Sequence, residues 1–155
     1  MVLSLRRRSP EEWSEDYPLV PYDRFVPFLR SKAAKKPVFL VTRFHPSYLE
    51  RLLGSLSPNV IPVWLSNVSS PTSVGPRELY RLESMALDNI RNRGTDVVLE
   101  GVEYLFLENG DVGALRFIGK LHDEAVIHGS GFYVVVSDAF SERQIAMLKG
   151  TLGLL

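Results

Sequence analysis

Cysteine is absent from this chain of 155 residues. Its absence excludes disulfides, thiolate zinc sites, iron–sulfur clusters and cysteine nucleophiles. An excess of either charge is also lacking, because 18 Lys and Arg residues balance 18 Asp and Glu residues. Neither a polybasic arm for nucleic acid nor an acidic disordered tail is therefore the dominant feature. The 45% of hydrophobic residues is enough for the core of one soluble domain.

No stretch of the sequence is apolar for long enough to suggest a membrane span. The longest segment without a charged residue, residues 52–76, contains six serines and four prolines. A helix through hydrocarbon needs a nearly continuous apolar run. The arginines at residues 6–8 follow the apolar start of the chain, whereas a secretory signal has its basic residues first. We therefore expect a cytoplasmic protein without a membrane span.

The first 36 residues differ from the rest and predict an N-terminal appendage. A capping box opens a short helix over residues 10–16, and a second helix is expected over residues 27–35. This appendage carries several large apolar residues, and two interpretations stay open. The segment either packs back across its own sheet or mediates self-association. These residues are Trp13, Tyr17, Tyr22, Phe25 and Phe28.

Residues 37–155 predict a single α/β domain. Strands and helices alternate four times, and the strands are continuous apolar runs, as in a sheet buried on both faces. We expect a three-layer fold with a mainly parallel sheet of four to five strands and helices on both faces. Residues 104–107 are either a helical turn or the fifth strand. The expected strands are residues 38–42, 60–65, 97–99 and 132–136, and the expected helices are residues 46–54, 76–94, 111–128 and 141–150.

Polar side chains follow every predicted strand, which places a candidate binding site at one edge of the sheet. Ligands of open parallel sheets bind beyond the carboxyl ends of the strands. The polar loop over residues 66–75 would serve as a lid for a nucleotide or another anion. The candidate binding residues are Arg43, His45, Ser66, Asn67, Glu100, Glu103 and Asp138.

Three of these residues carry two interpretations each. Glu100 directly follows a predicted strand. It either helps to hold Mg²⁺, or it has a structural role in which it pairs with Arg43 or caps a loop. Arg43 is correspondingly an anion clamp or an ion-pair partner. Asp138 is expected to cap the turn into the last helix rather than to act as an acid.

Motifs for catalysis are missing. A phosphate loop requires Gly-x4-Gly-Lys-Ser/Thr between a strand and a helix, and no such run occurs. The histidines at 122 and 128 lack the spacing of a zinc motif, and Ser130 lacks the flanks of a nucleophile elbow. We therefore expect no catalytic residues and no metal ligands, and a Mg-nucleotide is the only cofactor considered.

Several runs together resemble the archaeal family known as domain of unknown function 835. They are PVFLVTRFHP at residues 37–46, VWLS at 63–66, VVLEGVEYL at 97–105 and NG at 109–110. The resemblance covers about residues 37–149. It implies a RecA- or KaiC-like core that has lost its phosphate loop, and no established activity. It also implies a regulatory or docking role, because such domains occur attached to membrane or sensor proteins.

Two function hypotheses follow. The first is a non-catalytic regulatory or protein-interaction domain on a degenerate RecA-like fold. The alternative is a nucleotide or other anion binder that uses the carboxyl edge of the sheet. A protein partner or self-association through the N-terminal segment is expected, whereas nucleic acid is not, because aromatic and basic residues do not alternate as a stacking surface requires.

Overall fold

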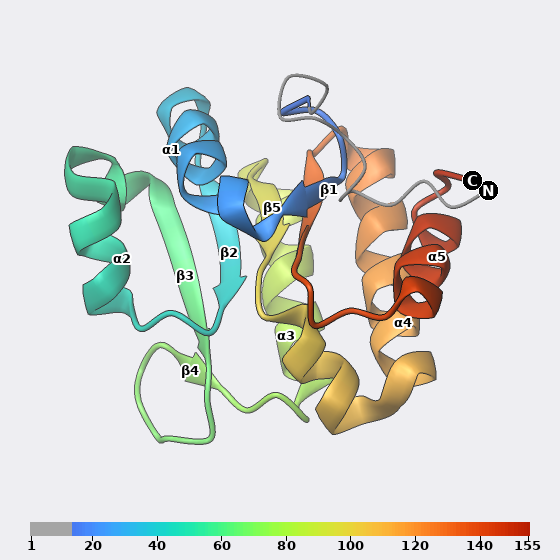
Figure 1. Cartoon of the computed structure of the whole chain (residues 1–155). Coiled ribbons are helices and arrows are strands. Elements are labelled where there is room, and N and C mark those ends of the chain that lie inside the picture. The colour runs from blue at the N-terminus through green and yellow to red at the C-terminus, as the bar shows by residue number, and fades with distance from the viewer. Residues whose placement is uncertain (1–13) are drawn as a thin grey trace.

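The computed structural model describes residues 14–155, so most of the helix predicted over residues 10–16 lies outside the described residues. The fold is α/β, as the sequence predicts, with a sheet in which every neighbouring pair of strands is parallel (Figure 1). The strands are β1 (Leu19–Pro21), β2 (Val38–Thr42), β3 (Val60–Leu65), β4 (Ser73–Val74), β5 (Asp96–Leu99) and β6 (Phe132–Val136). The α-helices are α1 (Phe25–Lys35), α2 (Pro46–Leu53), α3 (Leu79–Asp88), α4 (Val102–His128) and α5 (Glu142–Thr151). Shorter helical segments are η3 (Tyr22–Arg24), η4 (Gly54–Asn59) and η5 (Asn89–Arg93), the last a π-helical turn.

The strand order is β1-β6-β5-β2-β3-β4. From β2 the chain moves outward through α2 to β3 and β4, and then returns through α3 to the other side of β2, where β5 lies. The order therefore reverses between β2 and β5. In open α/β sheets this topological switch point is where the loops diverge and ligands most often bind.

The sheet is the middle of three layers because its central strands are apolar on both faces. All five residues of β2 and all four of β5 are buried. One face packs against apolar residues of α1 and α2, and the other face packs against α3, α4 and α5 (Figure 1). This arrangement matches the predicted helices on both faces.

Within residues 14–155 the sheet has six strands rather than the predicted four to five, because the short edge strands β1 and β4 extend it. β4 lies inside the loop predicted as a lid, where Ser73 pairs with Trp64 and Val74 pairs with Leu65 of β3. The second half of that loop is consequently part of the sheet.

The described part of the N-terminal segment packs against the sheet. Leu19 pairs with Val134 of β6, and the side chains of Phe25 and Phe28 are each only 1% exposed. The buried Lys32 on α1 donates a hydrogen bond of 2.9 Å from Nζ to the hydroxyl of Tyr133 on β6. Phe25 and Phe28 therefore belong to the core of their own chain, whereas Tyr22 is 49% exposed and Trp13 lies outside the described residues. The domain boundary at residue 36 stays a prediction.

Helix boundaries differ from the prediction in two places. The helix predicted over residues 76–94 is divided into α3 and the π-helical turn η5. Residues 104–107 are helical and lie in the first half of α4, which bends sharply at Gly110, where φ is 75° and ψ is 164°. Neither α4 nor any other helix within residues 14–155 has the length and apolar character that a bilayer crossing needs.

Candidate functional site

At the topological switch point, Glu100 lies directly after β5 and is hydrogen-bonded to residues at the end of β2. Glu100 Oε1 accepts hydrogen bonds from Thr42 Oγ1 at 2.5 Å and from the backbone N–H of Arg43 at 2.9 Å. The Thr42 hydroxyl in turn accepts from the backbone N–H of Phe44 at 2.9 Å. Glu100 thus caps the chain where it leaves β2, which is one of its two predicted roles.

Glu100 is only 6% exposed. Burial raises the pKa of Glu100 above its ordinary value, and the hydrogen bonds from Thr42 and Arg43 oppose that rise. The charge of the neighbouring Glu103 raises this pKa further. Such a group is costly to ionise and faces little water.

The guanidinium group of Arg43 is turned onto its own protein. It lies over the ring of Tyr104, with 4.5 Å from Cζ to the ring centroid, and Nη1 donates a hydrogen bond to the carbonyl of Leu65. Gly101 permits this placement, since an added Cβ there would lie 2.7 Å from Arg43 Cγ. Among the described residues no ion pair joins Arg43 to Glu100, so the partners of this arginine are an aromatic ring and a backbone carbonyl.

His45 begins the helix that follows β2. Its Nδ1 accepts a hydrogen bond of 3.1 Å from the backbone N–H of Ser47, and its ring lies edge-on to Trp64 at 4.8 Å. Because β2 ends at Thr42 and α2 starts at Pro46, the connection between them has three residues. The N-terminus of α2 is therefore capped by the chain itself.

A second pair of residues lies at the first turn of α4 and just after the end of β6. Ser137 Oγ donates a hydrogen bond of 2.5 Å to Glu103 Oε2, and the same hydroxyl accepts from the backbone N–H of Ala139 at 3.2 Å. Ser137 thus caps the turn for which Asp138 was predicted, and the capping prediction for Asp138 is wrong. Asp138 is exposed. Helix α5 is capped by Ser141, as the capping box predicts.

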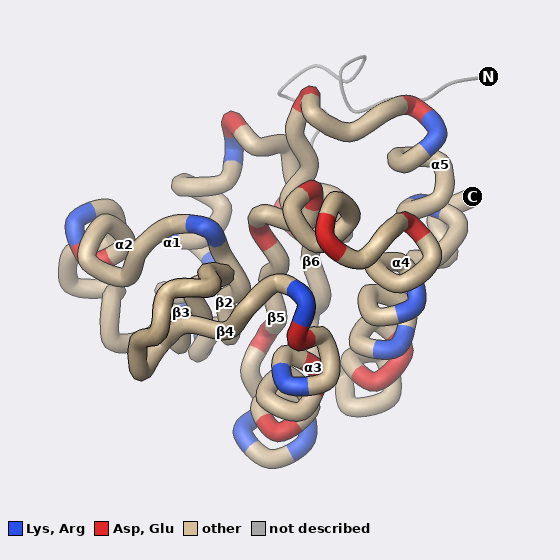
Figure 2. Tube along the Cα trace, turned by 90° about the horizontal axis from the view of Figure 1, so that it is seen from below, with Lys and Arg blue, Asp and Glu red and all other residues tan. Residues whose placement is uncertain are grey.

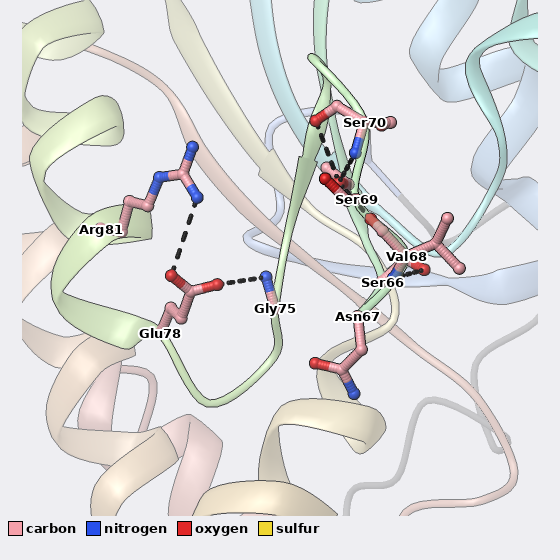
Figure 3. A pocket seen from close by; sticks show the side chains of 9 residues that line it. Ser66, Asn67, Val68, Ser69, Ser70, Gly75, Glu78 and Arg81 are labelled. Atoms are coloured by element: carbon pink, nitrogen blue, oxygen red, sulfur yellow. Dashed lines mark hydrogen bonds and ion pairs between the residues drawn. The ribbon is translucent and has the colours of Figure 1, made fainter.

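Ser66 and Asn67 lie apart from this cluster, at a cavity of about 300 Å³ beyond the end of β3 (Figure 3). Ser66 is buried, and its hydroxyl accepts from the backbone N–H of Val68 at 3.0 Å. Two cavity residues on the far wall, Glu78 and Arg81, come from the start of α3 and carry no sequence signal of their own. The predicted residues thus divide between two places.

Figure 2, which looks onto the carboxyl edge of the sheet, shows acidic and basic residues beside one another over the described part of the chain. Two aromatic residues at this edge were not predicted as site residues. Tyr104 supports Arg43, and Tyr22 follows β1. Burial raises the pKa of the Tyr22 hydroxyl, and the nearby charge of Glu100 raises it further. Within residues 14–155 no three His, Asp or Glu side chains are grouped so that they could hold a metal ion.

A family model described as "Protein of unknown function (DUF835)" matches residues 23–152. The chain belongs to the DUF835 family. The match includes every strand except β1, and every residue that the sequence predicts for the candidate site. No curated protein and no solved structure matches this DUF835 chain.

Proposed function

We propose that this DUF835 domain is non-catalytic and serves as a regulatory or protein-interaction domain on a degenerate RecA-like sheet. The observation that carries the proposal is how the polar groups at the strand ends are used. Glu100 caps the end of β2, and Arg43 bonds to Leu65 and stacks on Tyr104. These groups stabilise the sheet edge and are not arranged around a substrate.

The connection after β2 supports the same conclusion for nucleotides. A phosphate loop needs a longer, glycine-rich segment whose backbone N–H groups converge on phosphate oxygens. Here the connection is residues 43–45, which contain no glycine, and His45 accepts the N–H of Ser47 at the helix start. The alternative function, a nucleotide or anion binder at Arg43 and His45, would have to break these bonds first.

An interaction role is supported by apolar side chains on α4. Exposed apolar residues that adjoin one another favour a contact with another molecule, whereas scattered ones are ordinary. The consecutive residues Val126 and Ile127, near the end of α4, are 64% and 72% exposed. Leu107 and Val112, on either side of Gly110, are 77% and 67% exposed. We place the protein contact on this helix.

Turnover tests the non-catalytic claim. Phosphate release from Mg·ATP and from Mg·GTP is measured with the full chain and with Glu100→Gln. We expect background release from both proteins. Release by the unmodified chain that the substitution abolishes would contradict the proposal, because it would make Glu100 a catalytic carboxylate.

The mass in solution tests the other predicted interaction, self-association through the N-terminal segment. Phe25 and Phe28 are buried within one chain, whereas Tyr22 is 49% exposed and open to a second copy. Light scattering of the full chain is expected to give the mass of one chain, 17.5 kDa. A doubled mass would indicate a dimer. If Tyr22→Ser returned that mass to 17.5 kDa and Val126→Ser did not, the contact would lie on the N-terminal segment and not on α4.

A further inference from the structure

The cavity beside β3 has the volume of a small binding site and a predominantly polar lining. It lies between the chain that joins β3 to β4 and the start of α3, and its volume of about 300 Å³ is at the lower end of the range for small-molecule sites. Figure 3 shows the two walls, with the serine-rich loop on one side and the acidic and basic residues of α3 on the other. The residues that matter for its chemistry are Ser66, Asn67, Ser69, Ser70, Glu78 and Arg81.

The loop wall is held in place by its own hydrogen bonds. Ser73 Oγ donates to the carbonyl of Val68 at 2.6 Å and accepts the backbone N–H of Ser70 at 3.1 Å. Ser73 is itself fixed by β-pairing with Trp64. The cavity is therefore preformed, and a ligand would not have to order the loop.

One polar group of this wall has no partner among the described residues. The hydroxyl oxygen of Ser70 is buried without a hydrogen bond, although Ser70 lines the cavity. An unsatisfied buried hydroxyl is costly, and a rotation of the Ser70 side chain toward the cavity would let a ligand hydrogen-bond to it and remove that cost. Asn67 adds an exposed side-chain amide on the same wall.

Charge in the cavity is balanced. Arg81 Nη1 lies 3.7 Å from Glu78 Oε2, and both side chains line the cavity. Glu78 Oε1 accepts the backbone N–H of Gly75 at 3.0 Å. A carboxylate beside the guanidinium cancels most of its attraction for an anion. The hydroxyl and amide groups that remain both donate and accept hydrogen bonds.

Space at Gly75 adds a further constraint. An added Cβ at this position would lie 2.9 Å from Glu78 Oε1 and 3.0 Å from Asn67 Oδ1. A side chain at residue 75 would therefore move the side-chain oxygens of Glu78 and Asn67.

From the preformed cavity, the unpartnered hydroxyl and the balanced charge, we infer that this site binds a small neutral polyhydroxyl molecule of monosaccharide size or smaller. The site does not involve Glu100 or Arg43. The inference consequently stands apart from the proposed interaction role.

Titration of the isotopically labelled full chain tests the inference. Ribose, glucose and myo-inositol are added separately at millimolar concentrations, and inorganic phosphate and Mg·ATP serve as anionic probes. At least one polyol is expected to shift the backbone amide signals of residues 66–75 in a saturable manner. Phosphate and Mg·ATP are expected to leave those signals in place.

Two variants connect the binding to the cavity. Ser70→Ala removes the unpartnered hydroxyl and is expected to weaken polyol binding about three- to tenfold. Gly75→Ala, which moves Glu78 and Asn67, is expected to abolish it. Ser84→Ala, an exposed serine of α3 outside the cavity, is the matched control and should bind as the unmodified chain does.

Three results would overturn the inference. They are the absence of saturable shifts with every polyol, shifts at residues 66–75 from phosphate or Mg·ATP alone, and polyol binding that Ser70→Ala leaves unchanged. Because Ser70→Ala removes only a hydroxyl, it remains informative if Gly75→Ala fails to fold.

Discussion

Glu100 couples the stability of this domain to pH. Burial raises the pKa of its carboxyl group in the folded chain above the value in the unfolded chain. The folded state therefore binds the proton more tightly than the unfolded state does. The resulting stabilisation is fully present below the unfolded pKa and is lost as pH rises through the folded pKa.

Glu100→Gln removes this pH dependence, because the amide oxygen still accepts from Thr42 and Arg43 and carries no charge to bury. At neutral pH the variant is expected to be at least as stable as the unmodified chain, and the advantage of the variant should shrink as the solution is acidified. Melting temperatures across acidic and neutral pH measure this difference, with the exposed Glu50→Gln as control. A difference that stays constant with pH, or a variant that is less stable at neutral pH, would contradict the account.

Gly101 is required for two reasons, its conformation and the space beside it. Its φ is +77°, and a Cβ there would lie 2.7 Å from Arg43 Cγ. Gly94 has a similar φ of +63° but nothing within 4 Å of an added Cβ. Gly94→Ala is therefore expected to cost roughly 1–2 kcal/mol for the left-handed conformation alone. Gly101→Ala should cost roughly 2–5 kcal/mol because the clash with Arg43 is added. Denaturant unfolding measures both values, and equal losses would show that Arg43 is not held as described.

The sequence predicts where the strand-end residues lie but not what they contact. Arg43 and Glu100 follow apolar strands, and that pattern is sufficient to place them at one edge. The aromatic partner of Arg43, Tyr104, depends on how α4 starts after Gly101, which local propensity does not determine. Glu78 and Arg81 enter the cavity only because β4 redirects the chain, and no motif indicates that.

At the scale of elements, α4 is two helical parts joined at a glycine. Gly110 has φ 75° and ψ 164°, a conformation that is essentially restricted to glycine. Asn109 stabilises the bend, since its Nδ2 donates to the carbonyl of Pro76 at 2.9 Å. The bend directs the second half of α4 across the sheet.

Opposite effects are expected from two glycines of this helix. Gly110→Ala should lower the free energy of unfolding by about 1–3 kcal/mol, because alanine cannot adopt the bend without strain. Gly113→Ala, three residues further into regular helix, should raise it by about 0.5–1 kcal/mol. Thermal or denaturant unfolding of the two variants checks the signs. The same sign for both would show that α4 has no fixed bend at Gly110.

Elements were predictable in proportion to their length. The four central strands are apolar runs that indicate buried strands without further information. β1 and β4 have three and two residues, and β1 ends in Pro21, so their strand character depends on pairing with β6 and β3. For the same reason the serine-rich residues 66–75 were interpreted as a free loop.

For the whole molecule, the structure implies that the N-terminal segment and the sheet unfold together. Leu19 on β1 is fully buried, and it packs in the same apolar cluster as α3, α4 and α5. Leu19→Ala is therefore expected to lower the stability of the entire chain by about 2–5 kcal/mol. Leu107→Ala, at a residue that is 77% exposed, is the matched control and should have little effect.

A single transition, observed both by tryptophan fluorescence and by far-ultraviolet circular dichroism, is expected for Leu19→Ala. Two separate transitions, with only the smaller one shifted by the substitution, would support an appendage that is independent of residues 37–155. The layered architecture was predictable because strand and helix patterns alternate. How residues 14–36 join it was not, since that depends on the edge pairing of β1 with the distant β6.

We propose that the strand-end groups serve the fold and leave no nucleotide site at the topological switch point. The most direct measurement is the response of the backbone amide signals of Arg43, Ser47 and Glu100 to Mg·ATP and Mg·GTP in the full chain. These amides lie at the sheet edge and at the start of α2. The account predicts that none of the three signals moves. Saturable shifts of all three by either nucleotide would contradict it.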